Sequence, residues 1–261
     1  MPVIDRSLSV MLDGEPFSFS GRMRLRGKDE LSLFPALFTL ELWNLPEEYF
    51  LRLFRAQQIS VSRNDACLVS GTISDVFRHP AQEGVVTNVA ISLGLDLWES
   101  AVSLTVPAGV SISDAVRRIM AASGTGISLL ADLENDSRLI RPQSFFGRAA
   151  ECIATVLSAV SSRAMLTPSG LMAVPLGGLH DAVRVSETDL TDAPVFTGKV
   201  RRGSPSLMIL SATVSGWRPG QTAEVDYKDV HARGIITERS VDADTASGPW
   251  KSEMIVEVIY P

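Results

Sequence analysis

Cysteine and histidine are scarce in this chain of 261 residues. Its two cysteines, Cys67 and Cys152, lie far apart on apolar stretches. Two cysteines make neither a disulfide framework nor a metal knuckle, so we interpret both as buried free thiols. The three histidines, His79, His180 and His231, fall in predicted loops or turns and form no metal-like cluster with another ligand residue. The sequence therefore predicts no metal site.

An excess of positive charge is also missing. Asp and Glu number 30 against 24 Lys and Arg, which gives a net charge of −6. Proteins that bind nucleic acid draw most of their affinity from cationic side chains that neutralise phosphates. The charge balance therefore argues against a general nucleic-acid binder, although it is compatible with a local basic patch.

Long apolar runs and catalytic motifs are absent as well. The longest uncharged stretch, residues 164–180, is broken by prolines and glycines, and the N-terminus carries Asp5 and Arg6 without an apolar segment. We therefore expect neither a signal peptide nor membrane insertion. G-x-S-x-G, the P-loop and G-x-G-x-x-G do not occur, and Glu47 and Glu48 fit the first turn of a helix better than a catalytic pair. The sequence predicts no enzyme and no cofactor.

The first part of the chain carries β-strand patterns. Asp13-Gly14 between alternating apolar runs predicts a hairpin. Residues 22–26 alternate two apolar side chains, which should face inward, with three arginines, which should face outward. Residues 44–48 then predict the start of a short helix. That helix is expected to bury Phe50, Leu51 and Phe54.

Two amphipathic helices are predicted in the middle of the chain, at Ser111–Ala122 and Ser144–Ser162. The second is expected to be capped by Ser144 and to bury Phe146. A compact hairpin turning at residues 168–170 should follow.

From Val195 onward the apolar period returns to two, which predicts further strands. Asp242–Gly248 is expected to be a polar loop. Asp242 and Asp244 lack the ligand spacing of a calcium site, so we interpret them as part of a solvated turn. The strand candidates are Val200, Leu207–Leu210, Ala223–Val225, Gly234–Thr237 and Met254–Tyr260.

Two basic clusters and a tryptophan at a strand end form the candidate site. Three interpretations of the arginines stay open: a solvated face, a subunit interface that meets acidic residues of a neighbour, or a phosphate contact. The tryptophan fits either packing at a sheet rim or an interface anchor. The residues of the predicted interface are Arg22, Arg24, Arg26, Trp43, Arg201 and Arg202.

Taken together, the order of these segments resembles that of the hub and tail-tip proteins of bacteriophage tails. The resemblance is carried by an early hairpin, a strand that runs into a short helix, the entries to two helices, and a closing pair of strands. The matching segments are Phe38–Leu42, Trp43–Pro46, Gln58–Val61, Leu68–Ile73, Val106–Ala115, Phe145–Glu151, Trp217–Ala223, Gly234–Ile236 and Pro249–Met254.

This resemblance implies a mainly β fold with an α+β middle, in which two tail-tube-like β-barrel domains are joined by a small two-helix α+β segment. The corresponding domains are residues 1–100, 101–190 and 191–261. It also implies a homotrimeric ring, whose six barrels adapt a six-fold tail tube to a three-fold spike or tip. The chain is too short to carry the large inserted domains of bigger hubs.

The implied function is structural. The protein would be a baseplate hub or tail-tip ring subunit of a phage or prophage, located in the virion tail and assembled in the bacterial host cytoplasm. Its partners would be other copies of itself, the tail tube protein, the spike or tip protein and the tape-measure protein, and DNA would pass through the ring without specific binding.

Two alternatives stay open. A carbohydrate-binding or adhesin-like β module would need a shallow site lined by exposed aromatic residues. A tail-associated peptidoglycan hydrolase would need converging acidic residues or a Cys/His pair.

Overall fold

The computed structural model describes residues 5–134, 136–167, 169–175, 182–197 and 206–259. Strands dominate these residues, which confirms a mainly β fold. The chain forms two compact units: unit 1 contains residues 1–29, 36–93 and 181–261, and unit 2 contains residues 30–35 and 94–180. The division into three domains stays a prediction, although the first and last of those segments both contribute to unit 1.

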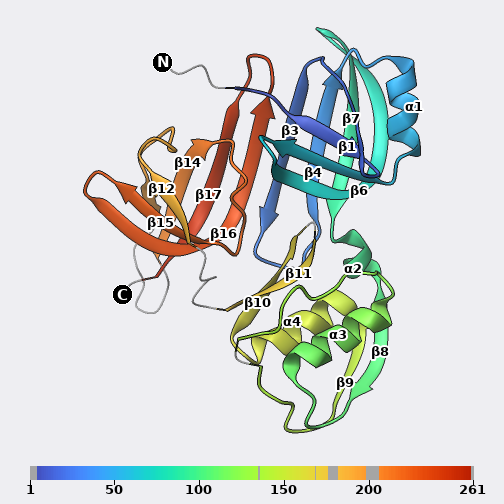
Figure 1. Cartoon of the computed structure of the whole chain (residues 1–261), viewed down its shortest axis with the longest axis vertical. Helices are drawn as coiled ribbons and strands as arrows, with labels where there is room; N and C mark the ends of the chain where they lie inside the picture. The colour runs from blue at the N-terminus through green and yellow to red at the C-terminus, as the bar shows by residue number, and fades with distance from the viewer. Residues whose placement is uncertain (1–4, 135, 168, 176–181, 198–205, 260–261) are drawn as a thin grey trace. The chain divides into compact units, whose positions relative to one another are not determined.

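Unit 1 consists of strands that pair in one continuous network, together with helix α1 (Figure 1). In the first part of the chain its elements are β1 (Ser9–Leu12), β2 (Glu15–Pro16), β3 (Met23–Glu30), β4 (Ala36–Trp43), α1 (Glu47–Arg55), β5 (Gln58–Arg63), β6 (Ala66–Ala81) and β7 (Gly84–Leu93). In the last part they are β12 (Ala182–Ser186), β13 (Val195–Thr197), β14 (Ser206–Thr213), β15 (Thr222–Tyr227), β16 (Val230–Asp244) and β17 (Trp250–Val258).

The strand order of this network is β13-β14-β17-β16-β3-β4-β7-β6-β5-β1-β2, and β15, which pairs β12, also pairs β16. Strand β3 therefore lies between β4 and β16 and joins the early strands to the late ones. The predicted late strands lie within β14 to β17, apart from Ile259, which follows the end of β17, and Val200 and Tyr260, which are outside the described residues. The two closed barrels stay a prediction.

The early hairpin and the alternation of β3 are confirmed. Asp13 and Gly14 connect β1 to β2 with φ of 49° and 84°, the left-handed conformation that a two-residue hairpin turn requires. Met23 and Leu25 are buried, whereas Arg24 between them and Arg26 after them lie on the opposite, more exposed face of the strand. The core of this region includes late residues such as Val241 and Trp250, so both ends of the chain share one apolar interior.

Helix α1 was predicted correctly in position but wrongly in the residues it buries. Its inward stripe passes through Tyr49, Phe50 and Leu53, of which only Leu53 is fully buried. Leu51 is 41% exposed and Phe54, which stacks on Phe50 at the edge of the stripe, is 66% exposed, so of the three predicted residues only Phe50 is partly buried. Successive residues of an α-helix lie about 100° apart around its axis, so a stripe misplaced by one position puts residues at the edge of the buried face or outside it.

Unit 2 holds a two-stranded ribbon and a hairpin packed with helices. Ser111 caps α3, where its hydroxyl accepts the Asp114 N–H at 3.1 Å, as predicted. The predicted hairpin is confirmed in β10 and β11, although Pro168 at its turn lies outside the described residues. The elements are α2 (Leu95–Glu99), β8 (Ala101–Val106), α3 (Ile112–Ser123), β9 (Gln143–Arg148), α4 (Ala149–Ser158), β10 (Ser162–Thr167) and β11 (Gly170–Pro175).

The predicted start of the second helix is wrong. Residues from Ser144 to Arg148 belong to β9, which pairs antiparallel with β8, and the helix begins only at Ala149. Phe145 turns inward while Phe146 is 87% exposed, as expected for neighbouring residues of a strand. Within the described part of the chain, no helix has the length and apolar character that crossing a bilayer would require.

Four ion pairs, here called the seam, connect β3 to β16. Arg22, directly before β3, binds both oxygens of Asp244 at 3.1 and 2.6 Å, and Arg24 binds both oxygens of Asp242 at 2.8 Å. The solvated-turn interpretation of these two aspartates is wrong, because both lie on β16 and Asp244 is fully buried. The other two pairs are Lys28 with Glu238 and Arg239 with Asp29.

Arg239 is the most deeply buried cation of the seam. Its side chain is 1% exposed, binds both oxygens of Asp29 at 2.9 and 2.7 Å, and donates to the Leu68 carbonyl at 2.8 Å. A buried cation is tolerated only while its counter-charge is present, because desolvation of an unpaired charge is costly.

We predict that Asp29→Asn lowers the free energy of unfolding by about 3 kcal/mol, because Arg239 is then left buried without a counter-charge. Adding Arg239→Met to this variant should restore part of the loss. Urea unfolding followed by circular dichroism measures both effects, with Glu187→Gln, at an exposed carboxylate, as the control. Equal stability of Asp29→Asn and the wild type would contradict the prediction.

The seam should also respond to acid. Burial raises the pKa of Asp244, but the hydrogen bonds from Arg22 and the Ala246 N–H and the charges of Arg22 and Arg24 lower it more, so the pKa lies below its ordinary 3.8. A lowered native pKa means that the ion pair stabilises the fold above pH 3.8 and that this stabilisation is lost as the pH falls through the native value.

We therefore predict that the urea midpoint of the wild type falls between about pH 5 and pH 2 more steeply than that of Asp244→Asn, which has no carboxylate to protonate. Asp75→Asn, at an exposed position of β6, should retain the wild-type slope. Parallel pH profiles for the wild type and Asp244→Asn would show that Asp244 contributes nothing to acid sensitivity.

Candidate functional site

The predicted interface residues fall into two groups. Arg22, Arg24, Arg26 and Trp43 lie on the outer face formed by β3 and β4, with a hydrogen bond of 3.1 Å from the Trp43 N–H to the Arg22 carbonyl. Arg201 and Arg202 lie outside the described residues.

Each arginine of the first group binds a carboxylate of this same chain. Arg22 and Arg24 bind the β16 aspartates of the seam, and Arg26 forms an ion pair with Glu41 on the neighbouring strand. The partners of Arg22 and Arg24 are 222 and 218 residues away in the sequence, which is why local patterns could not reveal them. The Arg26 side chain keeps 49% of its surface exposed, so it is the most accessible of the three.

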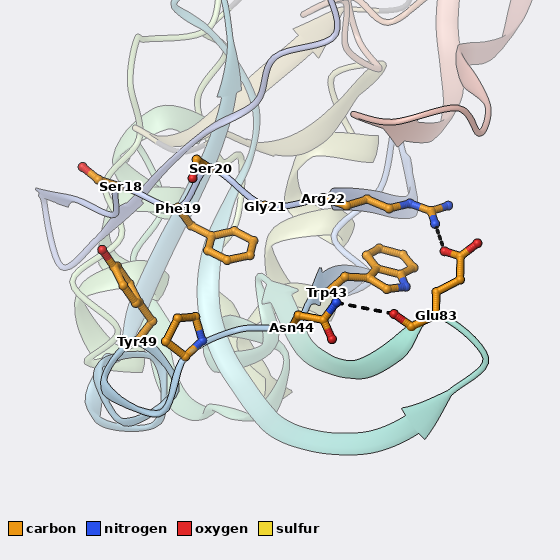
Figure 2. A pocket seen from close by; sticks show the side chains of 10 residues that line it. Ser18, Phe19, Ser20, Gly21, Arg22, Trp43, Asn44, Tyr49 and Glu83 are labelled. Carbon is orange, nitrogen blue, oxygen red and sulfur yellow. Dashed lines mark hydrogen bonds and ion pairs between the residues drawn. The ribbon is translucent and has the colours of Figure 1, made fainter.

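Arg22 and Trp43 also line a pocket of about 450 Å³ in unit 1. Three segments form it: the connection from β2 to β3, the end of β4 with the start of α1, and the turn between β6 and β7 (Figure 2). The lining residues are Ser18, Phe19, Ser20, Gly21, Arg22, Trp43, Asn44, Pro46, Tyr49 and Glu83.

Arg22 is held in one position by three partners. Asp244 binds its Nε and Nη2, Glu83 binds its Nη1, and its guanidinium lies 4.3 Å from the centroid of the Trp43 ring. The hydrogen bond to Asp244 raises the pKa of Arg22, against the effect of burial, so the group stays charged. Figure 2 shows the guanidinium extended over Trp43 toward the Glu83 carboxylate.

Asn44 fixes the turn that carries Glu83. Its side-chain carbonyl accepts the Val85 N–H at 3.1 Å, and its side-chain NH2 donates to the Glu83 carbonyl at 3.4 Å. Its own backbone has φ of 55°, a left-handed conformation that asparagine tolerates better than most residues. Asn44 was predicted to belong to the start of the helix, but the cap position is Pro46.

Aromatic rings form the other wall of the pocket. Tyr49 packs edge-on against the buried Phe17, with centroids 5.3 Å apart, and Phe19 lies 6.4 Å from Tyr49. In Figure 2 the Phe19 ring points toward Trp43. A Cβ at Gly21 would stand 2.3 Å from the end of the Phe19 ring, so glycine at this position lets the ring lie where it does.

Sequence reasoning identified two residues of this pocket and missed the rest. Phe19, Tyr49 and Glu83 carry no motif, and they line one pocket only because three separate segments of the chain converge. Phe19 continues the apolar alternation that follows Asp13-Gly14, but β2 ends at Pro16 and the chain leaves the sheet there. The signal that could have indicated this is Gly21 just before the arginine strand.

The residues that line the pocket include neither a histidine nor a cysteine. Among the described residues, no group of His, Cys, Asp and Glu is arranged to hold a metal ion. His79 lies on β6 and contacts Asn88 at 2.9 Å, and His231 lies on β16 within 2.9 Å of Asp226, so the predicted loop positions of these two are wrong. His180 lies outside the described residues. Both described cysteines are free thiols, Cys152 buried and Cys67 half-buried.

No protein-family model matches the sequence, and no curated protein sequence matches it either. Solved structures do match over nearly the whole chain. The tail protein from Neisseria meningitidis MC58 superposes with a TM-score of 0.72 at 10% identity, and the match covers 96% of this chain and 95% of that one.

Two further structures give a similar result. The 43 kDa tail protein of prophage MuSo2 from Shewanella oneidensis has a TM-score of 0.69 at 10% identity, with 97% of this chain and 98% of that chain covered. The E. coli c3393 protein, a component of the type VI secretion system with structural similarity to the T4 bacteriophage tail proteins gp27 and gp5, has a TM-score of 0.67 at 12% identity. That match covers 96% of this chain and 77% of the other. The chain therefore has the fold of phage and prophage tail proteins and of a type VI secretion component, which confirms the resemblance at the level of fold.

Proposed function

We propose that this protein is a non-enzymatic structural subunit of a phage or prophage tail, located at the baseplate hub or tail tip. The observation that carries the proposal is the end-to-end match with a tail protein, in which 96% of this chain corresponds to 95% of the other. The correspondence includes the helical insertion as well as the strands, so the whole chain is accounted for by one architecture. The same fold in a type VI secretion component supports a position at the tip.

The chemistry of the candidate site supports a structural role over a hydrolytic one. A hydrolase needs a carboxylate or thiol that is free to exchange a proton with its substrate. Glu83, the carboxylate that lines the pocket, and Asp244 are both engaged by Arg22. In this arrangement the carboxylates neutralise the Arg22 guanidinium and hold it in place, which is a structural role.

In the proposed assembly, three copies form a ring that connects the tail tube to the spike or tip, and each copy supplies two barrels. The ring would line the channel through which DNA passes, and the tape-measure protein would occupy that channel before DNA does. A wall that must not retain DNA should avoid cationic excess, because counterion release makes cationic surfaces bind it. The net charge of −6 meets this requirement.

The outer face of β3, β4 and β6 is the surface that we assign to contact between copies. Arg26 is half exposed there, Leu37 is 64% exposed opposite Lys28, and Phe77 is 49% exposed on β6. Arginine and aromatic residues are enriched in protein interfaces, and apolar side chains on a strand face gain from being covered. A closed ring needs one such face to meet a different face of the next copy.

We predict that the purified chain sediments as a trimer. The double variant that carries Arg26→Glu and Phe77→Ser should sediment as a monomer, because it lacks both the cation and the apolar contact. Sedimentation velocity measures the change. Arg118→Glu, which makes the same charge change at an exposed position of α3 in unit 2, is the control and should remain trimeric. A wild type that stays monomeric at high concentration would contradict the ring.

A further inference from the structure

The charges around the Arg22 pocket exclude most kinds of charged ligand. One cation, Arg22, faces two carboxylates, Asp244 and Glu83, and binds both of them. An anion such as a phosphate would meet a guanidinium that is already neutralised and a nearby exposed carboxylate. A cation would meet the fixed guanidinium. The pocket is therefore suited to a neutral ligand.

The lining also indicates the shape of that ligand. Phe19, Trp43 and Tyr49 offer aromatic surface, whereas Ser18, Ser20 and Glu83 offer hydroxyl and carboxylate groups at the edge. Aromatic rings bind apolar faces, and carboxylates and hydroxyls bind the O–H groups of a ligand. A molecule with a flat C–H face and hydroxyls around its rim satisfies both, and a pyranose sugar has that form.

Several of these groups are held in place without a ligand. Asp244 and Trp43 fix Arg22, Asn44 fixes the Glu83 turn, and Phe17 supports Tyr49. A site that is already ordered loses little conformational entropy when it binds. Its volume of about 450 Å³ lies within the ~300–1,000 Å³ typical of small-molecule sites.

We propose that this pocket binds a neutral pyranose residue, with the C–H face of the sugar on the aromatic wall and its hydroxyls toward Glu83 and the two serines. This binding activity goes beyond the structural role proposed above and does not depend on it. It gives specific support to the carbohydrate-binding alternative considered from the sequence, as an additional property of the same chain.

The test is saturation-transfer NMR and calorimetric titration of the full chain with four neutral probes: methyl β-glucopyranoside, methyl β-galactopyranoside, N-acetylglucosamine and maltohexaose. Inorganic phosphate is the anionic probe. At least one neutral sugar should bind saturably and phosphate should not. Preference for maltohexaose over the single sugars would indicate a polysaccharide as the source, and equal binding would indicate a free sugar.

Two variants locate the site. Glu83→Gln removes the exposed carboxylate and should weaken binding about tenfold, as expected for loss of a hydrogen bond to a charged group. Gly21→Ala displaces the Phe19 ring without changing any charge and should weaken binding comparably. Glu48→Gln, at an exposed carboxylate one residue before Tyr49 that does not line the pocket, should bind like the wild type.

The proposal fails if no neutral sugar binds the wild type, if phosphate alone binds, or if Glu83→Gln binds as tightly as the wild type. Should Gly21→Ala not fold, as judged by circular dichroism, Glu83→Gln decides the question alone. Sedimentation velocity on the same samples reports the oligomeric state separately, so failure of sugar binding and failure of ring formation are distinguishable.

Discussion

The pairing of β3 with β16 is the constraint on which the rest of unit 1 depends. Hydrogen bonds make the two strands neighbours, and four ion pairs across this seam connect residues more than two hundred positions apart. Exposed ion pairs add little to stability, but Asp244 and Arg239 are buried, so breaking their pairs leaves an uncompensated charge in the interior. The seam therefore penalises any alternative pairing of β3.

This pairing makes the two ends of the chain dependent on each other. The core that contains Leu25 and Leu40 also contains Val241 and Trp250, so the early strands cannot complete their apolar interior alone. The segment from residue 94 to residue 180 lies in the sequence between the early and the late strands of unit 1. It forms its own core around α3 and α4. Unit 2 is in this sense an insertion within unit 1, whereas linear sequence reasoning described three consecutive domains.

Sequence reasoning was most successful where a local rule determines the structure. The Asp13-Gly14 turn, the inward Met23 and Leu25, and the Ser111 cap follow from hairpin geometry, strand alternation and capping chemistry. It was least successful where a contact with a residue distant in the sequence determines the local structure. Residues 144–148 have the composition of a helix entry, yet pairing with β8 makes them a strand. The two β16 aspartates resembled a solvated turn because their arginine partners precede them by most of the chain.

The candidate site shows the same division. Arg22 and Trp43 were identified because a run of alternating arginines and a tryptophan at a strand end are visible in the local sequence. One interpretation of the arginines was contact with acidic residues of a neighbouring copy. The structure supplies those acidic residues from within the chain. No pattern in the sequence indicated that Glu83 would face Arg22, because that contact depends on the Asn44 hydrogen bonds between two turns.

The two surfaces assigned on the outer face of β3 and β4 are far enough apart to act independently. In the register of this pair, Met23 lies opposite Leu42 beside the pocket, and Lys28 lies opposite Leu37 in the proposed contact between copies. The members of the two surfaces that lie nearest to each other on this strand, Arg22 and Arg26, are separated by four steps of about 3.3 Å, or about 13 Å. All three arginines are paired within the chain, but Arg26 is the most exposed of them, so it is the one proposed to reach a neighbouring copy, on the far side of Arg24 from the pocket. Assembly through the Arg26 end therefore leaves the aromatic pocket accessible, and one strand can serve both purposes.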